Sequence, residues 1–137
     1  MSYVFAGGLQ ARVYERLAGD AGLAALVAGA IYDAPLAMAP EATEYVTLGE
    51  ETVRDWGTKT SGGAIHDFTV TAHSGRDGFD GVKRVAAAVC AALVDAPLAL
   101  EAGRLVALRF LRASTERGRA PAKRKVTLRF RAMVDGD

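Results

Sequence analysis

The sequence predicts an α+β fold, in which a mainly antiparallel mixed sheet carries two long helices packed on one face. Three observations support this prediction. Two segments repeat apolar residues at the spacing of an amphipathic helix, several others alternate apolar and polar residues as half-buried strands do, and the order is helix, strands, helix, strands. The length of 137 residues suits a single domain that spans residues 1–137.

The first elements are helical. Leu9, Val13 and Leu17 recur at four-residue steps with charged residues between them, which predicts an amphipathic helix from about Tyr3 to Leu17. A Gly-Asp pair ends this helix, and the aspartate can cap a shorter second helix from Ala21 to about Ala28. Both helices are expected to bury one side.

The middle of the chain is rich in β-forming residues. Residues 31–32 are expected to form a short strand, and residues 33–44 a loop with two prolines. Residues 45–48 read as a strand, and the polar residues 50–63 as an exposed excursion. Residues 65–73 alternate apolar and polar side chains, which predicts a half-buried strand.

The last part repeats the helix-then-strands order. Apolar residues from Phe79 to Leu93 predict the second long helix, and Leu98 and Leu100 a short strand. Residues 104–113 are expected to form a strand with Val106, Leu108 and Phe110 on its inner face. A basic loop over residues 114–124 follows, and residues 125–134 are expected to form the final strand.

Composition and charge narrow the function classes. Half of the residues are apolar and 24% are charged, which is typical of a folded globular protein. No run of residues is long and apolar enough to cross a bilayer, and the first residues lack the pattern of a secretory signal. We therefore expect a soluble intracellular protein. The net charge of +1 conceals an asymmetry, because residues 1–100 carry 7 basic and 12 acidic side chains, and residues 101–137 carry 10 and 4.

The histidines do not form a catalytic pattern. His66 and His73 lie seven positions apart on one predicted strand, and this odd spacing places them on opposite faces, so they are not expected to share a metal ion. His66, Asp67 and the nearby Ser61 offer the residue types of a catalytic triad. Adjacent strand residues point apart, however, so Asp67 is not expected to orient His66.

Two glycine-rich segments and one cysteine are the remaining candidates for a phosphate-binding or catalytic site. Residues 57–63 and 75–81 have neither the dinucleotide-binding nor the P-loop spacing. We interpret the first segment as a mobile surface loop and the second as a turn that leads into a helix. Cys90 is expected to be a buried, inert thiol. The sequence therefore predicts no enzyme activity, no cofactor and no metal site.

The basic residues of the last strands are more informative. The alternation places several of them on the face opposite the apolar side chains. These residues are Arg109, Lys125, Arg129 and Arg131. Arginine is well suited to protein interfaces, so an acidic neighbouring subunit is one partner for this face. Contact with the phosphates of duplex DNA and a merely solvated face remain alternatives.

Several motifs together resemble one family. Residues 45–60 read Y-V-T-L-G-E-E-T-V-x-D-W-x-T-K-T, and G-x-x-I-H-D-F-T-V, R-L-V-x-L-R-F and L-R-F-R-A follow. The chain resembles the tail completion (tail terminator) family of long, non-contractile-tailed phages. It is especially similar to the version in the gene transfer agents of alphaproteobacteria such as Rhodobacter. The resemblance covers nearly the whole chain and is most specific from Tyr45 to Phe68.

The resemblance implies a structural role without an active site. Such proteins form a hexameric ring on the last ring of the tail tube, stop its growth and provide the surface that joins the head. The implied partners are copies of the chain itself, the tail tube protein and a head-side connector or stopper protein, with DNA passing transiently through the lumen and no membrane. The implied location is the bacterial cytoplasm during assembly and then the head-proximal end of the tail.

The resemblance and the charge pattern suggest where contacts form. A ring needs two complementary patches on each subunit. We expect the basic face to meet acidic residues of the next copy, among them Glu50 and Glu51. We also expect a second group to contact the tube or the connector. Its members are Asp55, Trp56, Lys59, Arg117 and Arg119.

Three alternatives stay open at this point. Trp56 can be exposed for a partner or buried against the helices. A head-completion or connector adaptor protein of the neck is a rival function, and a small enzyme is a more distant one.

Overall fold

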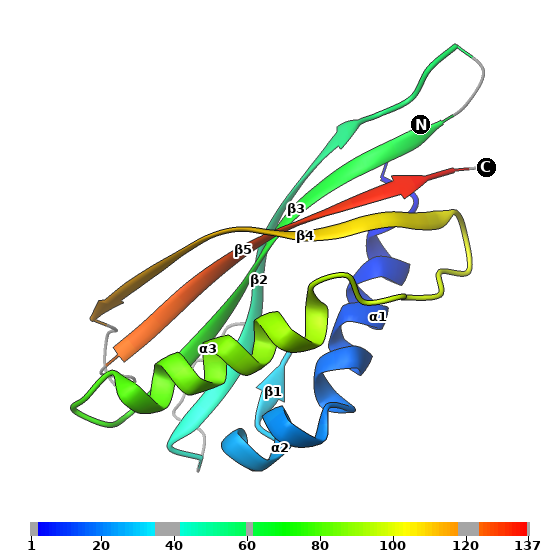
Figure 1. Cartoon of the computed structure of the whole chain (residues 1–137). Helices are drawn as coiled ribbons and strands as arrows, with labels where there is room; N and C mark the ends of the chain where they lie inside the picture. The colour runs from blue at the N-terminus through cyan, green and yellow to red at the C-terminus, as the bar shows by residue number, and fades with distance from the viewer. Residues whose placement is uncertain (1–2, 35–41, 60–61, 118–123, 137) are drawn as a thin grey trace.

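The computed structural model describes residues 3–34, 42–59, 62–117 and 124–136. Three helices and five strands form within these residues, and the helices lie together on one side of the sheet (Figure 1). In chain order they are α1 (Ala6–Ala18), α2 (Ala21–Val27), β1 (Ile31–Tyr32), β2 (Glu44–Asp55), β3 (Gly63–Ser74), α3 (Asp80–Leu93), β4 (Arg104–Arg117) and β5 (Arg124–Asp135).

The five strands form one mixed sheet in the order β1-β2-β3-β5-β4. The short β1 runs parallel to β2, and every other pair is antiparallel. The predicted fold class is therefore confirmed. The helices α1 and α3 are the two long ones, and one face of the sheet is left without a helix over it (Figure 1).

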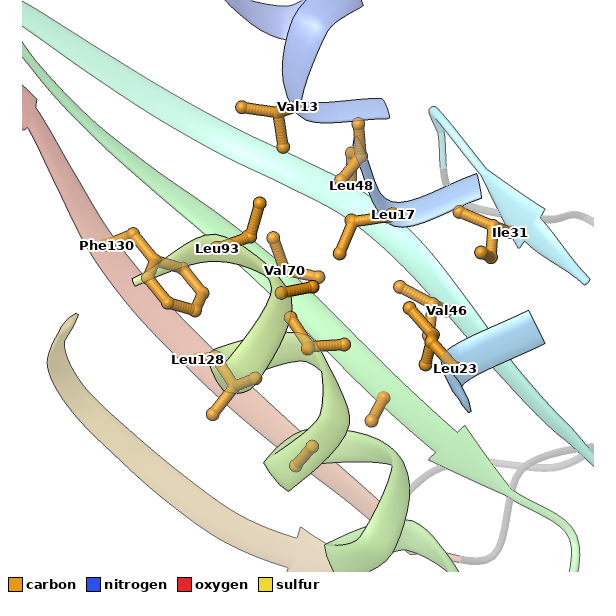
Figure 2. Close-up of a cluster of buried hydrophobic side chains, with 14 of the residues drawn as sticks. Val13, Leu17, Leu23, Ile31, Val46, Leu48, Val70, Leu93, Leu128 and Phe130 are labelled. Carbon is orange, nitrogen blue, oxygen red and sulfur yellow. The ribbon is translucent and has the colours of Figure 1, made fainter. Parts of the chain in front are cut away.

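The core lies between the helices and the covered face of the sheet. Figure 2 shows Val13 and Leu17 of α1 and Leu93 of α3 pointing toward Val70 of β3 and Phe130 of β5. The helix spacing found in the sequence places these side chains on the buried sides of α1 and α3. On β5 the alternation is strict, because every second residue from Val126 to Val134 is buried.

The two outer long strands contain bulges, whereas the two inner ones do not. The pairing shifts in β2 between Leu48 and Glu51, and it shifts twice in β4, once after Leu105 and once after Phe110. The pairing of β3 with β5 has no shift. The prediction that Val106 lies on the inner face is wrong. The first bulge of β4 turns its side chain away from the core and leaves it 45% exposed, and Leu105 packs against the core instead.

Two other predicted segments differ from the structure. The excursion predicted over residues 50–63 is shorter in the structure, since β2 continues to Asp55 and β3 already begins at Gly63. The bulge near Glu50 interrupts the alternation of inward and outward side chains, so the second half of the strand cannot be recognised from the sequence. The short strand predicted at Leu98 and Leu100 is absent from the described residues, since this segment follows Pro97 and pairs with no strand.

Smaller differences concern boundaries and loops. The first helix begins at Ala6 rather than at Tyr3, and β4 extends to Arg117 into the predicted basic loop. Most of the loop predicted over residues 33–44 lies outside the described residues. No helix in the described ranges is long and apolar enough to cross a membrane.

Candidate functional site: an assembly surface

Arginines of neighbouring strands lie side by side on the uncovered face of the sheet. Arg109 of β4 is paired with Arg131 of β5, and Arg112 is paired with Arg129 in the next row. Directly opposed residues of antiparallel strands share a face and lie close together. The structure thus brings three of the four predicted basic residues into one cluster and adds Arg112 to it. Bulge geometry explains why alternation alone missed Arg112.

One carboxylate partly neutralises this cluster. The Nε and Nη2 atoms of Arg131 donate to Asp67 on β3 at 2.8 and 2.9 Å. These hydrogen bonds lower the pKa of Asp67, and the same pair raises the pKa of Arg131. The guanidinium groups of Arg109, Arg112 and Arg129 remain in excess, so this part of the face is basic.

The other end of the uncovered face is nearly neutral. Lys125, predicted to act with the arginines, lies farther along β5 with its Nζ atom 3.6 Å from Glu116 Oε1. Beside it, His73 stacks on Tyr45 with ring centroids 4.5 Å apart and lies 2.9 Å from the hydroxyl of Thr47. Burial, followed by the charge of Lys125, lowers the pKa of His73 to about 4, so this imidazole is neutral at physiological pH.

The predicted acidic partners lie on the bulged part of β2. Glu50 is exposed, as an interface carboxylate requires. Glu51 faces the helices instead, because its Oε2 atom lies 3.1 Å from Nδ1 of the fully buried His66 and its Oε1 accepts from the hydroxyl of Tyr3 at 3.4 Å. This contact was not predicted from the sequence. The signal for it is the alternation of Glu51 and Val53, which continues the strand beyond the bulge and places Glu51 on the side that faces the helices.

The predicted contact loop divides between two ends of the sheet. Asp55, Trp56 and Lys59 lie at the tip of the β2–β3 hairpin, which projects beyond the rest of the sheet (Figure 1). The backbone N–H of Trp56 donates to the carbonyl of Gly63 at 3.0 Å, and its side chain is 39% exposed. Trp56 is therefore not buried against the helices.

The remaining members of that group lie elsewhere. Arg117 ends β4 opposite Arg124, at the end of the sheet away from Trp56. Arg119 lies outside the described residues. Asp55 is exposed, and a hydrogen bond from the backbone of Gly57 lowers its pKa.

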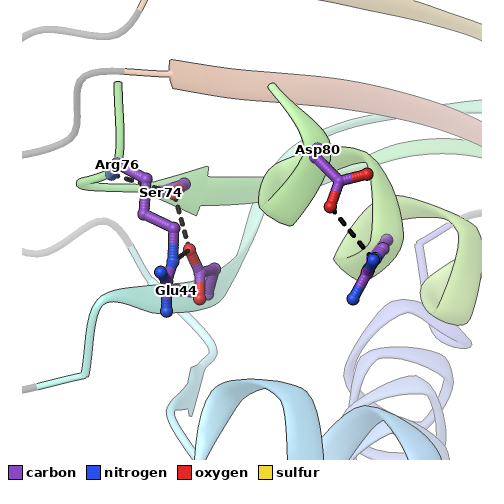
Figure 3. A network of polar contacts seen from close by, with 5 residues as sticks. Glu44, Ser74, Arg76 and Asp80 are labelled. Carbon is purple, nitrogen blue, oxygen red and sulfur yellow. Dashed lines mark hydrogen bonds and ion pairs between the residues drawn. The ribbon is translucent and has the colours of Figure 1, made fainter. Parts of the chain in front are cut away.

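A second polar cluster joins the start of β2 to the end of β3 (Figure 3). The buried carboxylate of Glu44 accepts from Ser74 Oγ at 2.7 Å and from Arg76 Nε at 2.8 Å. A Cβ atom on Gly81 would lie 2.9 Å from Glu44 Oε2, so glycine gives this carboxylate its room. An open hollow of about 400 Å³ lies beside it, lined also by Leu26. The described hydrogen bonds of Glu44 all come from side chains of the same chain, so the cluster has a structural role.

The residues considered for catalysis do not combine. His66 and His73 lie on opposite faces of β3, and Asp67 pairs with Arg131 rather than with His66. Ser61 lies outside the described residues. Within the described ranges, no three acidic, histidine or cysteine side chains are placed to hold a metal ion. Cys90 is half-buried rather than fully buried, and burial raises the pKa of its thiol.

Comparisons with known proteins agree on one kind of protein. The family described as Tail completion protein gp17 matches residues 11–135. Among solved structures, a chain of the virion of a native gene transfer agent (GTA) particle is 49% identical, with a TM-score of 0.89. The match covers 98% of this chain and 100% of that one. No curated protein sequence matches the chain at a significant level.

Proposed function

The chain belongs to the tail completion protein gp17 family, and from that premise we propose that it terminates the tail of a phage-like particle. Copies of the chain form a hexameric ring on the last ring of the tail tube, stop its elongation and present the surface to which the head joins. The observation that carries this proposal is the nearly full-length likeness, at 49% identity, to a chain of a gene transfer agent virion. The role is structural and involves no catalysis.

The charge distribution supports the formation of a ring. A ring of identical subunits needs two different patches that complement each other. The uncovered face carries Arg109, Arg129 and Arg131 on the β4–β5 side, and the exposed Glu50 lies at the opposite margin on β2. Lys125 belongs to the same proposed seam, although it also has a partner within the chain, whereas Glu51 is turned toward His66 and Tyr3.

The tip of the β2–β3 hairpin supports a contact outside the ring. Trp56 is the single tryptophan of the sequence and stays partly exposed there, flanked by the charged Asp55 and Lys59. A large aromatic side chain at a projecting tip is typical of an anchor that a partner buries. The tip is proposed to contact the tube protein or the head-side connector. Arg117, at the other end of the sheet, is proposed to contact whichever of the two the tip does not. Arg119 is proposed for the same contact from its sequence alone.

Deletion of the gene from its source genome tests the function directly. The particles would be examined by electron microscopy, with the wild-type gene restored on a plasmid as the control. Overlong or ragged tails without heads are the expected result, because tube growth would have no stop and the head no joining surface. Tails of normal length beside filled, unattached heads would favour the neck adaptor instead. Normal particles would contradict both roles.

A further inference from the structure

The sheet ends on one side in a long strand edge. β4 is the last strand of the sheet, and all its residues from Arg109 to Arg117 are exposed. Three large apolar side chains of this strand, Val106, Phe110 and Leu111, are between 38% and 45% exposed. A long edge with exposed apolar side chains invites another strand unless something covers it. Within the described residues one backbone contact covers it, from the N–H of Asp95 to the carbonyl of Leu108 at 3.0 Å.

The hydrogen-bond alternation identifies the backbone groups that point outward. The carbonyl of Leu108 faces away from β5, because it accepts from Asp95. The carbonyl of Gly63 faces β2, because it accepts from Trp56. In a strand, the backbone groups of successive residues point alternately to one side and to the other. When this alternation is followed from Gly63 through the unbroken β3–β5 pairing to β4, the carbonyl of Leu108 again points away from β5. Beyond the second bulge, the same alternation makes Thr115 an outward-facing residue.

The opposite side of the sheet also has an open edge. β1 covers β2 only at Val46 and Thr47. From Leu48 to Asp55, no described strand lies on the outer side of β2. Each copy therefore presents two unpaired edges, at opposite sides of one sheet.

The charges of the two edges are complementary. The β4 edge carries Arg109, Arg112 and Arg117 beside a single carboxylate, Glu116, so it is basic on balance. The open part of β2 carries the exposed Glu50 and Asp55 beside a single exposed cation, Arg54, so it is acidic on balance. Two β4 edges placed together would oppose arginines to arginines, which is unfavourable. A β4 edge beside a β2 edge opposes arginines to carboxylates. The charge pattern thus selects the second copy's β2 as the occupant of the β4 edge.

We propose that β4 of one copy adds to the open edge of β2 of the next copy as an antiparallel strand, so that the sheet continues across the subunit seam. This inference rests on the proposed ring and specifies how its copies touch. β2 and β4 run in opposite directions within the chain. Rotation about a ring axis parallel to the strands does not change strand direction, so β4 of one copy is also antiparallel to β2 of the next. Main-chain hydrogen bonds supply the contact, and Glu50 and Asp55 set its polarity.

A proline at an outward-facing position tests the backbone contact. Thr115→Pro removes an N–H that points away from β5 and pairs with no strand of the described residues, whereas Thr115→Val keeps it. Native mass spectrometry of the purified protein is expected to show rings for the wild type and for Thr115→Val. For Thr115→Pro, association is expected to weaken at least about tenfold per seam, with an unchanged circular dichroism spectrum. Thr115→Pro copies that form rings as the wild type does would overturn the edge contact while leaving the terminator function intact.

Mixing two deficient variants tests the pairing of edges. Thr115→Pro retains an intact β2 edge, and the double variant Glu50→Lys with Asp55→Lys retains an intact β4 edge. Mixed in equal amounts, they are expected to form 1:1 heterodimers and nothing larger, because only one seam is possible. Rings or no complex in the mixture would overturn the proposal. Wild-type copies that remain monomeric even on purified tail tubes would overturn the ring of the proposed function itself.

Discussion

Contacts between individual side chains stabilise the uncovered face of the sheet, on which no described helix packs. His73 fills space on this face by stacking on Tyr45, and the hydroxyl of Thr47 lies within hydrogen-bonding distance of its ring. Thr71 and Thr127 lie beside Thr47 in one cross-strand row. Such cross-strand contacts stabilise a sheet where no second layer packs on it.

The low pKa of His73 makes stability depend on pH. Its pKa of about 4 in the folded state lies below the ordinary 6.5, so the unfolded chain takes up the proton first as the pH falls. The contribution is therefore complete above about pH 6.5 and is lost on acidification toward pH 4. Because the ring is partly exposed, we expect it to amount to about 1–2 kcal/mol. Urea unfolding at several pH values would show a shallower acid-side slope for His73→Gln, and equal slopes would contradict the assignment.

At the scale of elements, the Glu44 cluster joins the start of β2 to the end of β3 and to the turn that follows it. Glu44 begins β2, Ser74 ends β3, and Arg76 lies in the turn that leads to α3 (Figure 3). Ser74 Oγ also accepts from the backbone N–H of Arg76 at 3.1 Å. The cluster therefore fixes where α3 begins relative to the sheet, and with it the side of α3 that faces the core.

Removal of the hydroxyl of Ser74 is expected to loosen this junction. Ser74→Ala leaves the buried Glu44 carboxylate with one partner fewer, which should lower the free energy of unfolding by about 1–3 kcal/mol. Ser114→Ala is the matched control on exposed β4, where we expect less than about 0.5 kcal/mol. Chemical denaturation of both variants measures the difference. Equal stabilities would mean that water replaces the hydroxyl at no cost.

Elements with an unbroken period could be predicted from the sequence, and those with an interrupted one could not. β5 and α3 were predicted within one or two residues because one side of each packs on the core along its whole length. The second half of β2 was missed, since the bulge at Glu50 shifts the alternation. In the candidate site, the shared face of Arg109, Arg129 and Arg131 followed from alternation. The pairing of Glu51 with His66 did not, because it depends on which strands become neighbours.

At the scale of the whole molecule, the charge asymmetry of the sequence becomes a separation in space. The basic C-terminal residues form β4 and β5 at one side of the sheet, and the acidic Glu50 lies on β2 toward the other side. A nearly neutral protein can thus carry two charged margins. Such an arrangement orients identical copies head to tail and disfavours face-to-face pairs.

Charge reversal at the centre of the basic face tests this arrangement. Arg129→Glu is expected to weaken ring assembly by at least about tenfold at low salt, since it places a carboxylate where the seam requires a cation. Lys83→Glu, on the exposed side of α3, changes the net charge equally and should assemble normally. Analytical ultracentrifugation at two salt concentrations gives the comparison. Undisturbed assembly of Arg129→Glu would remove the basic face from the seam.

The bulges also determine the shape of the sheet. Between the same paired ends, β4 contains two residues more than β5, and the pairing of β2 with β3 shifts once, whereas β3 and β5 match residue for residue. A surface whose margins are longer than its middle cannot lie flat and takes the form of a saddle. The curvature is therefore encoded by surplus residues rather than by side-chain chemistry. Deletion of one surplus residue from a margin is therefore expected to flatten the sheet there.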